Sequence, residues 1–230
     1  MVKRILFTML CLSLSFPLCS QSLYVFVPTE TRANVMQEKI NSFCPGVEVT
    51  AFGRAKDFHK QIEQAPPNAI LSLLPVLERT SDYITALKGL KNGLETENYV
   101  LVSVDSPLKM SEIGQKKIGV VDLLGRKPMT SFVEQLFKTP VKLKRVTKVE
   151  DLLPLITFGS VDGIFVSSSL FNQLKAKSNL NLVATNLDIK IGLASAAHND
   201  AQVKDKLKSC ILAFDQGLNS ILGVDQWRTL

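Results

Sequence analysis

A short apolar run, a glycine-containing loop and an amphipathic segment follow one another in Lys117-Ile118-Gly119-Val120-Val121-Asp122-Leu123-Leu124-Gly125-Arg126-Lys127-Pro128-Met129-Thr130-Ser131-Phe132-Val133-Glu134-Gln135-Leu136-Phe137. The run 118–121 is typical of a strand that is covered on both faces. Apolar residues at helical spacing in 132–137 indicate a helix with one buried side. Ser131 and Glu134 match a capping box, and Pro128 disfavours helix before it, so we expect the helix to begin near Ser131.

The junction between this strand and this helix is a candidate binding site. The start of a helix has free backbone N–H groups, which suit an anionic group of a ligand. Thr130 and Ser131 could add hydroxyl donors, and Arg126 could pair with a carboxylate or phosphoryl group. The alternative is a plain connection in which Ser131 caps the helix and Arg126 is solvated, because caps use the same residue types.

Strand and helix patterns alternate along most of the chain. Strands are expected at 23–27, 47–52, 68–74, 98–104, 117–121, 142–146, 161–166, 180–185 and 189–195. Helices are expected at 35–43, 57–64, 76–87, 149–158, 170–177 and 203–218, with a short final helix bearing Trp227. Asn199 and Gln202 are expected to cap the long C-terminal helix. The alternation predicts an α/β fold with parallel sheets and helical crossovers.

The order of these elements predicts two Rossmann-like lobes. Two α/β units are followed by a tail of one strand and one long helix, which is too small to be a domain. If the tail returns to the first unit, the chain crosses between the lobes twice, as a hinge requires. We therefore expect lobe 1 to contain residues 23–101 and 187–230, and lobe 2 to contain residues 102–186.

The N-terminus has the features of a secretion signal. Lys3 and Arg4 precede an apolar run from Ile5 to Leu18, and small residues follow it. This predicts a signal peptide over residues 1–22 and a periplasmic location. An uncleaved anchor is the alternative. Cys19 does not favour lipidation, because Leu18 precedes it where a small residue is expected.

Composition narrows the possible partners. The chain has 230 residues and a formal net charge of +6, without a dense basic tract. This favours a small anionic ligand over nucleic acid. Of the four cysteines, Cys11 and Cys19 fall in the predicted signal, which leaves Cys44 and Cys210. An exported compartment permits a disulfide between them, and two separate buried thiols are the alternative.

Motifs of catalysis and metal binding are scarce. His59 and His198 are the only histidines, and neither has the spacing of a metal-ligand pair. The sequence contains no nucleophile elbow, C-x-x-C pair or phosphate-binding loop of the Walker type. We expect no cofactor and no enzymatic activity. A small hydrolase or transferase that uses Asp122 or Asp162 remains an alternative.

The stretch at 117–137 and the stretch Val149-Glu150-Asp151-Leu152-Leu153-Pro154-Leu155-Ile156-Thr157-Phe158-Gly159-Ser160-Val161-Asp162-Gly163-Ile164 resemble bacterial periplasmic solute-binding proteins of the two-lobe, type II kind. The amino-acid receptors of family 3 are nearest in size, and the phosphonate-receptor-like branch is the rival. The resemblance implies a monomer that closes on a ligand and delivers it to an ABC-type importer. A ligand-sensing accessory of a membrane receptor is the alternative.

Candidate ligand-binding residues follow the strands, because ligands of open α/β sheets sit beyond the carboxyl ends of strands. They are Thr29, Arg32, Ser72, Arg126, Thr130, Ser131, Ser167 and Ser168. The family pattern of an arginine ahead of the second-lobe strand is missing from 105–116, and Gly125 is followed by Arg126 rather than threonine. The resemblance therefore implies the fold rather than an amino-acid ligand, and we expect a small polar, anionic solute.

Overall fold

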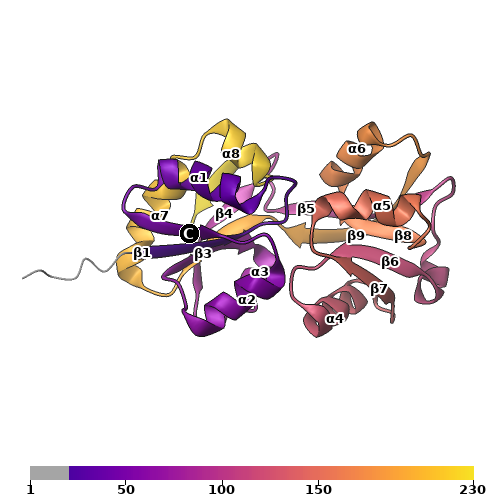
Figure 1. Ribbon diagram of the computed structural model, residues 1–230, viewed down its shortest axis with the longest axis horizontal. Coiled ribbons are helices and arrows are strands. Elements are labelled where there is room, and N and C mark those ends of the chain that lie inside the picture. Colours follow the sequence, from indigo (N-terminus) through magenta and orange to yellow (C-terminus); the bar gives the residue numbers. More distant parts are fainter. Residues whose placement is uncertain (1–20) are drawn as a thin grey trace, which may run out of the picture.

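The computed structural model describes residues 21–230, which form two sheets that lie side by side with helices on both faces of each (Figure 1). The α/β fold class predicted from the alternation of patterns is confirmed. The predicted signal peptide lies outside the described residues except for its last two positions. Among residues 21–230, no helix combines the length and the apolar character needed to cross a bilayer.

The first sheet has six strands in the order β11-β4-β10-β3-β1-β2. They are β1 (Gln21–Phe26), β2 (Val47–Ala51), β3 (Ala69–Leu73), β4 (Ile84–Leu90), β10 (Ala194–His198) and β11 (Gln226–Thr229). Strands β1, β2 and β3 are parallel, whereas β10 runs antiparallel to both β3 and β4. All five residues of β3 are buried, as expected for a central strand that is covered on both faces.

The second sheet has five strands in the order β7-β6-β8-β5-β9. They are β5 (Thr96–Val104), β6 (Lys117–Val121), β7 (Lys142–Val146), β8 (Gly163–Ser167) and β9 (Leu182–Gly192). Strands β7, β6 and β8 are parallel, and β5 is antiparallel to both β8 and β9. The carboxyl ends of β6 and β8 therefore lie at the same edge of this sheet.

Helices cover both faces of each sheet. In the first lobe these are α1 (Ala33–Phe43), α2 (Ala55–Gln64), α3 (Leu74–Leu77), α7 (Ala201–Leu212) and α8 (Gln216–Ile221). In the second lobe they are η1 (Met110–Gln115), α4 (Arg126–Phe137), η2 (Val149–Asp151), α5 (Leu152–Thr157) and α6 (Ser168–Lys177), of which η1 and η2 are short 3-10 helices. Figure 1 shows α4 on the opposite side of the second sheet from α5 and α6.

Strands β5 and β9 carry the chain between the lobes. They pair from Thr96, opposite Gly192, to Val104, opposite Leu182, with one irregularity in register. Both strands belong to the second sheet, so the chain changes sheets before Thr96 and after Gly192. The predicted boundaries at residues 101 and 187 fall within this ladder, because β9 is one continuous strand where the sequence predicts two, at 180–185 and 189–195. Leu193 follows β9: its N–H donates to Glu95 O, next to β5, and its carbonyl accepts from Leu74 N in the first lobe.

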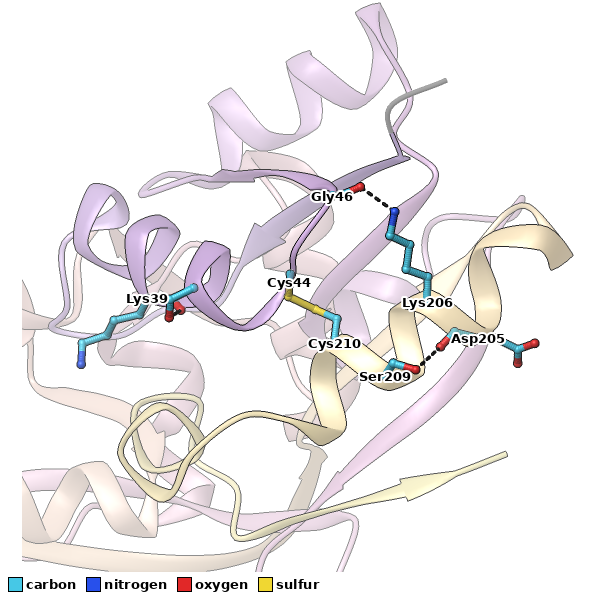
Figure 2. The surroundings of a disulfide bond; sticks show 8 residues. Lys39, Cys44, Gly46, Asp205, Lys206, Ser209 and Cys210 are labelled. Atoms are coloured by element: carbon cyan, nitrogen blue, oxygen red, sulfur yellow. Dashed lines mark hydrogen bonds between the residues drawn. A yellow bond between two sulfur atoms is a disulfide. The ribbon is translucent and has the colours of Figure 1, made fainter. Parts of the chain in front are cut away.

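The C-terminal segment returns to the first lobe. Cys44, at the end of α1, forms a disulfide with Cys210 in α7, across a sequence separation of 166 residues (Figure 2). Next to the disulfide, Lys206 Nζ donates to Gly46 O at 2.7 Å. Both cysteines are buried. A covalent bond and a hydrogen bond thus join the C-terminal helix to the N-terminal unit.

Two predicted helices are wrong because sheet pairing takes their residues. Of the expected helix at 76–87, only 76–77 is helical, at the end of α3, and Ile84–Leu90 forms β4 between β10 and β11. Trp227 lies in β11 rather than in a final helix, and its indole N–H donates to Asn219 Oδ1 at 2.8 Å. Strands β4 and β11 lie at one edge of the first sheet, and the strands that pair with them come from distant parts of the sequence.

Two predicted helix caps are also wrong. Helix α4 begins at Arg126 after Gly125, which has φ = 83°, so Ser131 lies inside the helix and caps nothing. Pro128 is accommodated because a proline in the first turn lacks only an N–H that needs no helical partner. Helix α7 is capped by Asp200, whose side chain accepts from Gln202 N at 2.9 Å, rather than by Asn199.

Candidate functional site between the lobes

A cavity of about 850 Å³ lies between the two lobes. The loop after β1 and the ends of β3 and α8 line it from the first lobe, and the ends of β6 and β8 with parts of α4 and α6 line it from the second. Strands β5 and β9 contribute Glu97, Tyr99 and Ile191. The carboxyl ends of parallel strands in both sheets thus face one space, which is where ligands of open α/β sheets bind.

Lys91, Glu97 and Ser169 form a polar cluster in the wall of this cavity. Glu97 Oε1 accepts from the backbone N–H of Ser169 at 3.0 Å and from Lys91 Nζ at 3.3 Å. Lys91 Nζ also donates to Ser169 Oγ. The Glu97 side chain is 15% exposed and that of Lys91 is 26% exposed. The cluster therefore joins the turn after β4, the start of β5 and the start of α6.

Helix α6 begins at this cluster because its first N–H groups are satisfied there. Ser167 Oγ accepts from Leu170 N at 3.2 Å, and the Glu97 carboxylate accepts from Ser169 N. A carboxylate at the start of a helix is stabilised by the N–H groups and by the helix dipole. The N-terminus of α6, which faces the cavity, is thus already bound to a carboxylate of the protein, that of Glu97.

Tyr99 lies beside this cluster, on the same face of β5 as Glu97, because strand residues two positions apart point to the same side. Its ring centroid is 5.2 Å from that of Phe165. Burial, with a further contribution from the charge of Glu97, raises the pKa of the Tyr99 hydroxyl well above its usual range. Tyr99 therefore presents a neutral hydroxyl and an aromatic face to the cavity.

The second lobe gives the cavity a largely apolar wall. Besides Tyr99 and Phe165, this wall contains Val120, Val121, Leu123, Met129, Phe132, Val149 and Leu170. Charged residues are few in the whole cavity: Lys91 is the only basic one among the described lining residues, against the carboxylates of Glu30, Glu97 and Asp225. Arginine is absent from the described lining.

Two of the eight predicted ligand-binding residues line the large cavity. Thr29 does so from the loop after β1, where its hydroxyl accepts from Thr31 N at 3.1 Å. Ser167 does so as the N-cap of α6. Ser168 is next to Ser167 but donates to Asn98 O and is not among the lining residues.

Four of the predicted residues lie away from the cavity. Ser72 is fully buried, and its hydroxyl donates to the carbonyl of Phe26 within the first sheet. Thr130 donates to Arg126 O inside α4. Arg126 and Ser131 are exposed on α4, whose buried side faces the core instead. These residues stabilise strands and helix turns or meet solvent.

Arg32 lines a second, smaller cavity of about 220 Å³. It lies next to the large one and shares the segment 27–31 with it, while 147–150 provides the opposite side. Arg32 is also the residue before α1, and its carbonyl accepts from Met36 N. The guanidinium that was expected to meet the ligand from the first lobe thus belongs to the neighbouring cavity.

Sequence reasoning missed Lys91 and Glu97. The turn that carries Lys91 follows β4, for which the sequence pattern predicts a helix, so the pattern indicates no carboxyl end of a strand at this point. Glu97 precedes the predicted strand at 98–104 and has no motif around it. The residues Ile84–Leu90 do not alternate strictly between polar and apolar, so no local period identifies this segment as a strand. Within residues 21–230, no group of three His, Cys, Asp or Glu side chains is placed to hold a metal ion.

Direct contacts join the lobes on two sides of the cavity. Lys177 Nζ, at the end of α6, lies 2.7 and 2.6 Å from the two carboxylate oxygens of Glu30. His59 Nε2, on α2, lies 3.3 Å from the carbonyl oxygen of Leu123. A carbonyl oxygen accepts only, so Nε2 carries the proton in this bond. The structure therefore shows the lobes in contact around the cavity.

The two sheets, the paired crossing strands and the returning C-terminal helix define the two-lobe fold of type II periplasmic binding proteins. No protein-family model matches the chain, and no curated protein matches it in sequence. Many solved structures share the fold, at low sequence identity.

Three of these structures illustrate the likeness. XAC2383 from Xanthomonas citri, bound to ATP, has a TM-score of 0.63 and 11% identity over 92% of this chain and 92% of its own. The GluR0 ligand-binding core from Nostoc punctiforme, in complex with L-glutamate, has a TM-score of 0.61 and 8% identity over 88% of this chain and 96% of its own. AbpA from Streptococcus pneumoniae Canada MDR_19A is an amino acid ABC transporter substrate-binding protein bound to L-arginine. It has a TM-score of 0.59 and 14% identity over 88% of this chain and 93% of its own. At these identities the likeness concerns the fold.

Proposed function

We propose that the protein is an exported solute-binding receptor that closes its two lobes on a small solute. The observation that carries the proposal is the cavity of about 850 Å³, whose walls come from both lobes and from both crossing strands. A solute in this position contacts both lobes at once, so it binds the closed form more tightly than the open form. Binding then shifts the population towards closure.

Delivery to an ABC-type importer in the membrane is the proposed consequence of closure. Structures with this fold include substrate-binding proteins of amino acid ABC transporters. The predicted signal peptide agrees with a periplasmic location, and we propose that the receptor acts there as a monomer. A neighbouring permease gene would favour import, whereas a neighbouring kinase or cyclase gene would favour a role as a sensing accessory.

The side chains of the cavity suit binding rather than bond chemistry. Ser169 is the hydroxyl nearest a basic group, but Lys91 donates to it and to Glu97 at the same time. A lysine that is paired with a carboxylate acts as a donor and is a poor base for a hydroxyl nucleophile. Asp122 accepts from Gly125 N at 2.8 Å and Asp162 from Lys117 N at 2.7 Å, so both carboxylates hold backbone in place.

Native mass spectrometry of the secreted protein tests the proposal. We expect a copurified or added solute to bind with one-to-one stoichiometry and to reduce the radius of gyration measured by small-angle X-ray scattering. The variant Gln173→Trp should weaken binding without loss of the fold, because Gln173 is exposed on α6 and lines the cavity. Turnover of the bound solute, or failure of a broad solute library to bind, would contradict the proposed function.

A further inference from the structure

The start of α6, where the wall of this cavity could hold an anion, is occupied by a carboxylate of the protein. At the start of α6, the backbone N–H of Ser169 and the ammonium of Lys91 both donate to Glu97. A ligand carboxylate would need donors of this kind.

The rest of the lining offers an anion little compensation for lost hydration. Lys91 is the only basic side chain among the described lining residues, and it is already engaged. Glu30 and Asp225 add negative charge at the wall. Burying a charged group without a partner is strongly unfavourable, so an anionic solute would bind weakly.

The apolar wall favours a different kind of solute. Tyr99 and Phe165 present aromatic surface beside Glu97 of the cluster, and Phe132 adds a further aromatic ring to the lining. Aromatic and aliphatic lining with a few fixed polar groups is the usual composition of a site for a hydrophobic organic ligand. Aromatic faces beside a carboxylate also tolerate a cationic group.

We infer that Glu97 takes the place of a ligand carboxylate at the start of α6, so that the cavity selects a hydrophobic solute with a neutral or cationic head and rejects anions. This inference rests on the proposed function and names the ligand class of the same cavity. It differs from the anionic solute that the sequence favours, because Arg126 and Arg32, the expected anion-binding residues, do not line this cavity.

Matched probes test the inference. Tryptamine, indole-3-ethanol and indole-3-acetate share one ring system and differ in the head group, and phenyl and cyclohexyl series can be built in the same way. We expect the amine and the alcohol to bind at least about tenfold more tightly than the acid, measured by thermal shift and calorimetry.

Substitution of Glu97 should increase the affinity for the acid probe. If Glu97 only stabilised the fold, its substitution would not increase this affinity. Glu97→Gln removes the negative charge and leaves the Lys91 ammonium without its carboxylate, so affinity for the acid should rise about tenfold while affinity for the alcohol stays the same. Glu95→Gln is the matched control, because Glu95 is two residues away and pairs with Lys88 and Arg228 outside the cavity.

The outcomes separate the two proposals. Tighter binding of acids than of alcohols by the unmodified protein, or no gain for the acid in Glu97→Gln while the alcohol still binds, overturns the ligand class and leaves the receptor function standing. Failure of every series and of a wider solute library overturns the receptor function, and the ligand class with it. Circular dichroism of Glu97→Gln establishes that the variant is folded.

Discussion

Lys177 and Glu30 join the two lobes through an ion pair whose ammonium lies 2.7 and 2.6 Å from the two carboxylate oxygens. Lys177 ends α6 in the second lobe, and Glu30 follows β1 in the first. Their side chains are 53% and 40% exposed, and a solvated pair of this kind contributes at most about 1 kcal/mol. That is enough to bias a hinge whose two states are close in free energy, so this pair should act as a weak latch.

The first prediction concerns this latch. Glu30→Gln should shift the protein towards the open form, which raises the mean distance between spin labels placed on exposed positions of α1 and α5. About 0.5–1 kcal/mol should be lost from the closed state, and high salt should have the same effect on the unmodified protein. The charge exchange Glu30→Lys with Lys177→Glu should restore the closed distance. Unchanged label distances in Glu30→Gln would contradict a role for the pair in closure.

The disulfide gives a second prediction. The bond between Cys44 and Cys210 closes a loop with a separation of 166 residues, and such a cross-link limits the freedom of the unfolded chain. Replacing both cysteines by alanine should therefore lower the free energy of unfolding by about 2–4 kcal/mol, measured by urea denaturation. A reductant should destabilise the unmodified protein and leave the double variant unaffected. Equal destabilisation of both proteins by the reductant would show that the cross-link is not the cause.

Strands and helices with a clear period could be predicted from the sequence. The strand–loop–helix at 117–137 and the alternation around it gave the α/β class, because a buried strand and an amphipathic helix each leave a local pattern. Segments whose state depends on distant partners could not be predicted in this way. Ile84–Leu90 becomes β4 because β10 and β11 pair with it from more than a hundred residues away.

The site could be placed only in part, for a related reason. The rule that ligands lie beyond the carboxyl ends of strands singles out Thr29 and Ser167, which line the large cavity in the structure. It did not separate these residues from Ser72, whose hydroxyl is used by a neighbouring strand, or from Ser131, which lies within a helix. The hydroxyls that cap, bridge and bind are chemically alike, so their role follows from tertiary position. His198 is a further case: polar Asn199 and Asp200 follow it in the sequence, but it is buried at the end of β10.

A third prediction concerns close packing between the first sheet and the cavity wall. A Cβ atom on Gly89 would lie 2.5 Å from the backbone oxygen of Ala194 and would also clash with the side chain of Val224, which lines the cavity. Gly89→Ala should therefore cost about 1–3 kcal/mol of stability, because the clash with backbone cannot be relieved by a rotamer change. Urea denaturation measures the loss.

Gly53→Ala is the matched control for this substitution. A Cβ atom on Gly53 would meet only the Cβ of Ala33, at an ordinary distance of 3.8 Å. The two variants make the same change in the unfolded chain, so their difference reports the packing of the folded state. Equal midpoints of denaturation for the two variants would mean that the first sheet adjusts freely at Gly89.

The fourth prediction follows from Tyr83, whose hydroxyl donates to Pro67 O at 2.6 Å. Burial, with the charges of Asp82 and Tyr24 adding to it, raises the pKa of Tyr83 from 10.0 to about 12. The unfolded chain therefore loses this proton first as the pH rises. The stabilisation that Tyr83 contributes is complete below pH 10 and is lost as the pH rises to about 12.

Difference titration of the tyrosinate absorbance between the unmodified protein and Tyr83→Phe isolates this group. We expect the difference to appear near pH 12 in the folded protein and near pH 10 in concentrated urea, where the tyrosines are solvated. The free energy of unfolding of Tyr83→Phe should also fall less steeply above pH 10, because the variant has no phenol to ionise at this position. A difference that already appears near pH 10 in the folded protein would show that Tyr83 is solvated and that its bond to Pro67 does not persist in solution.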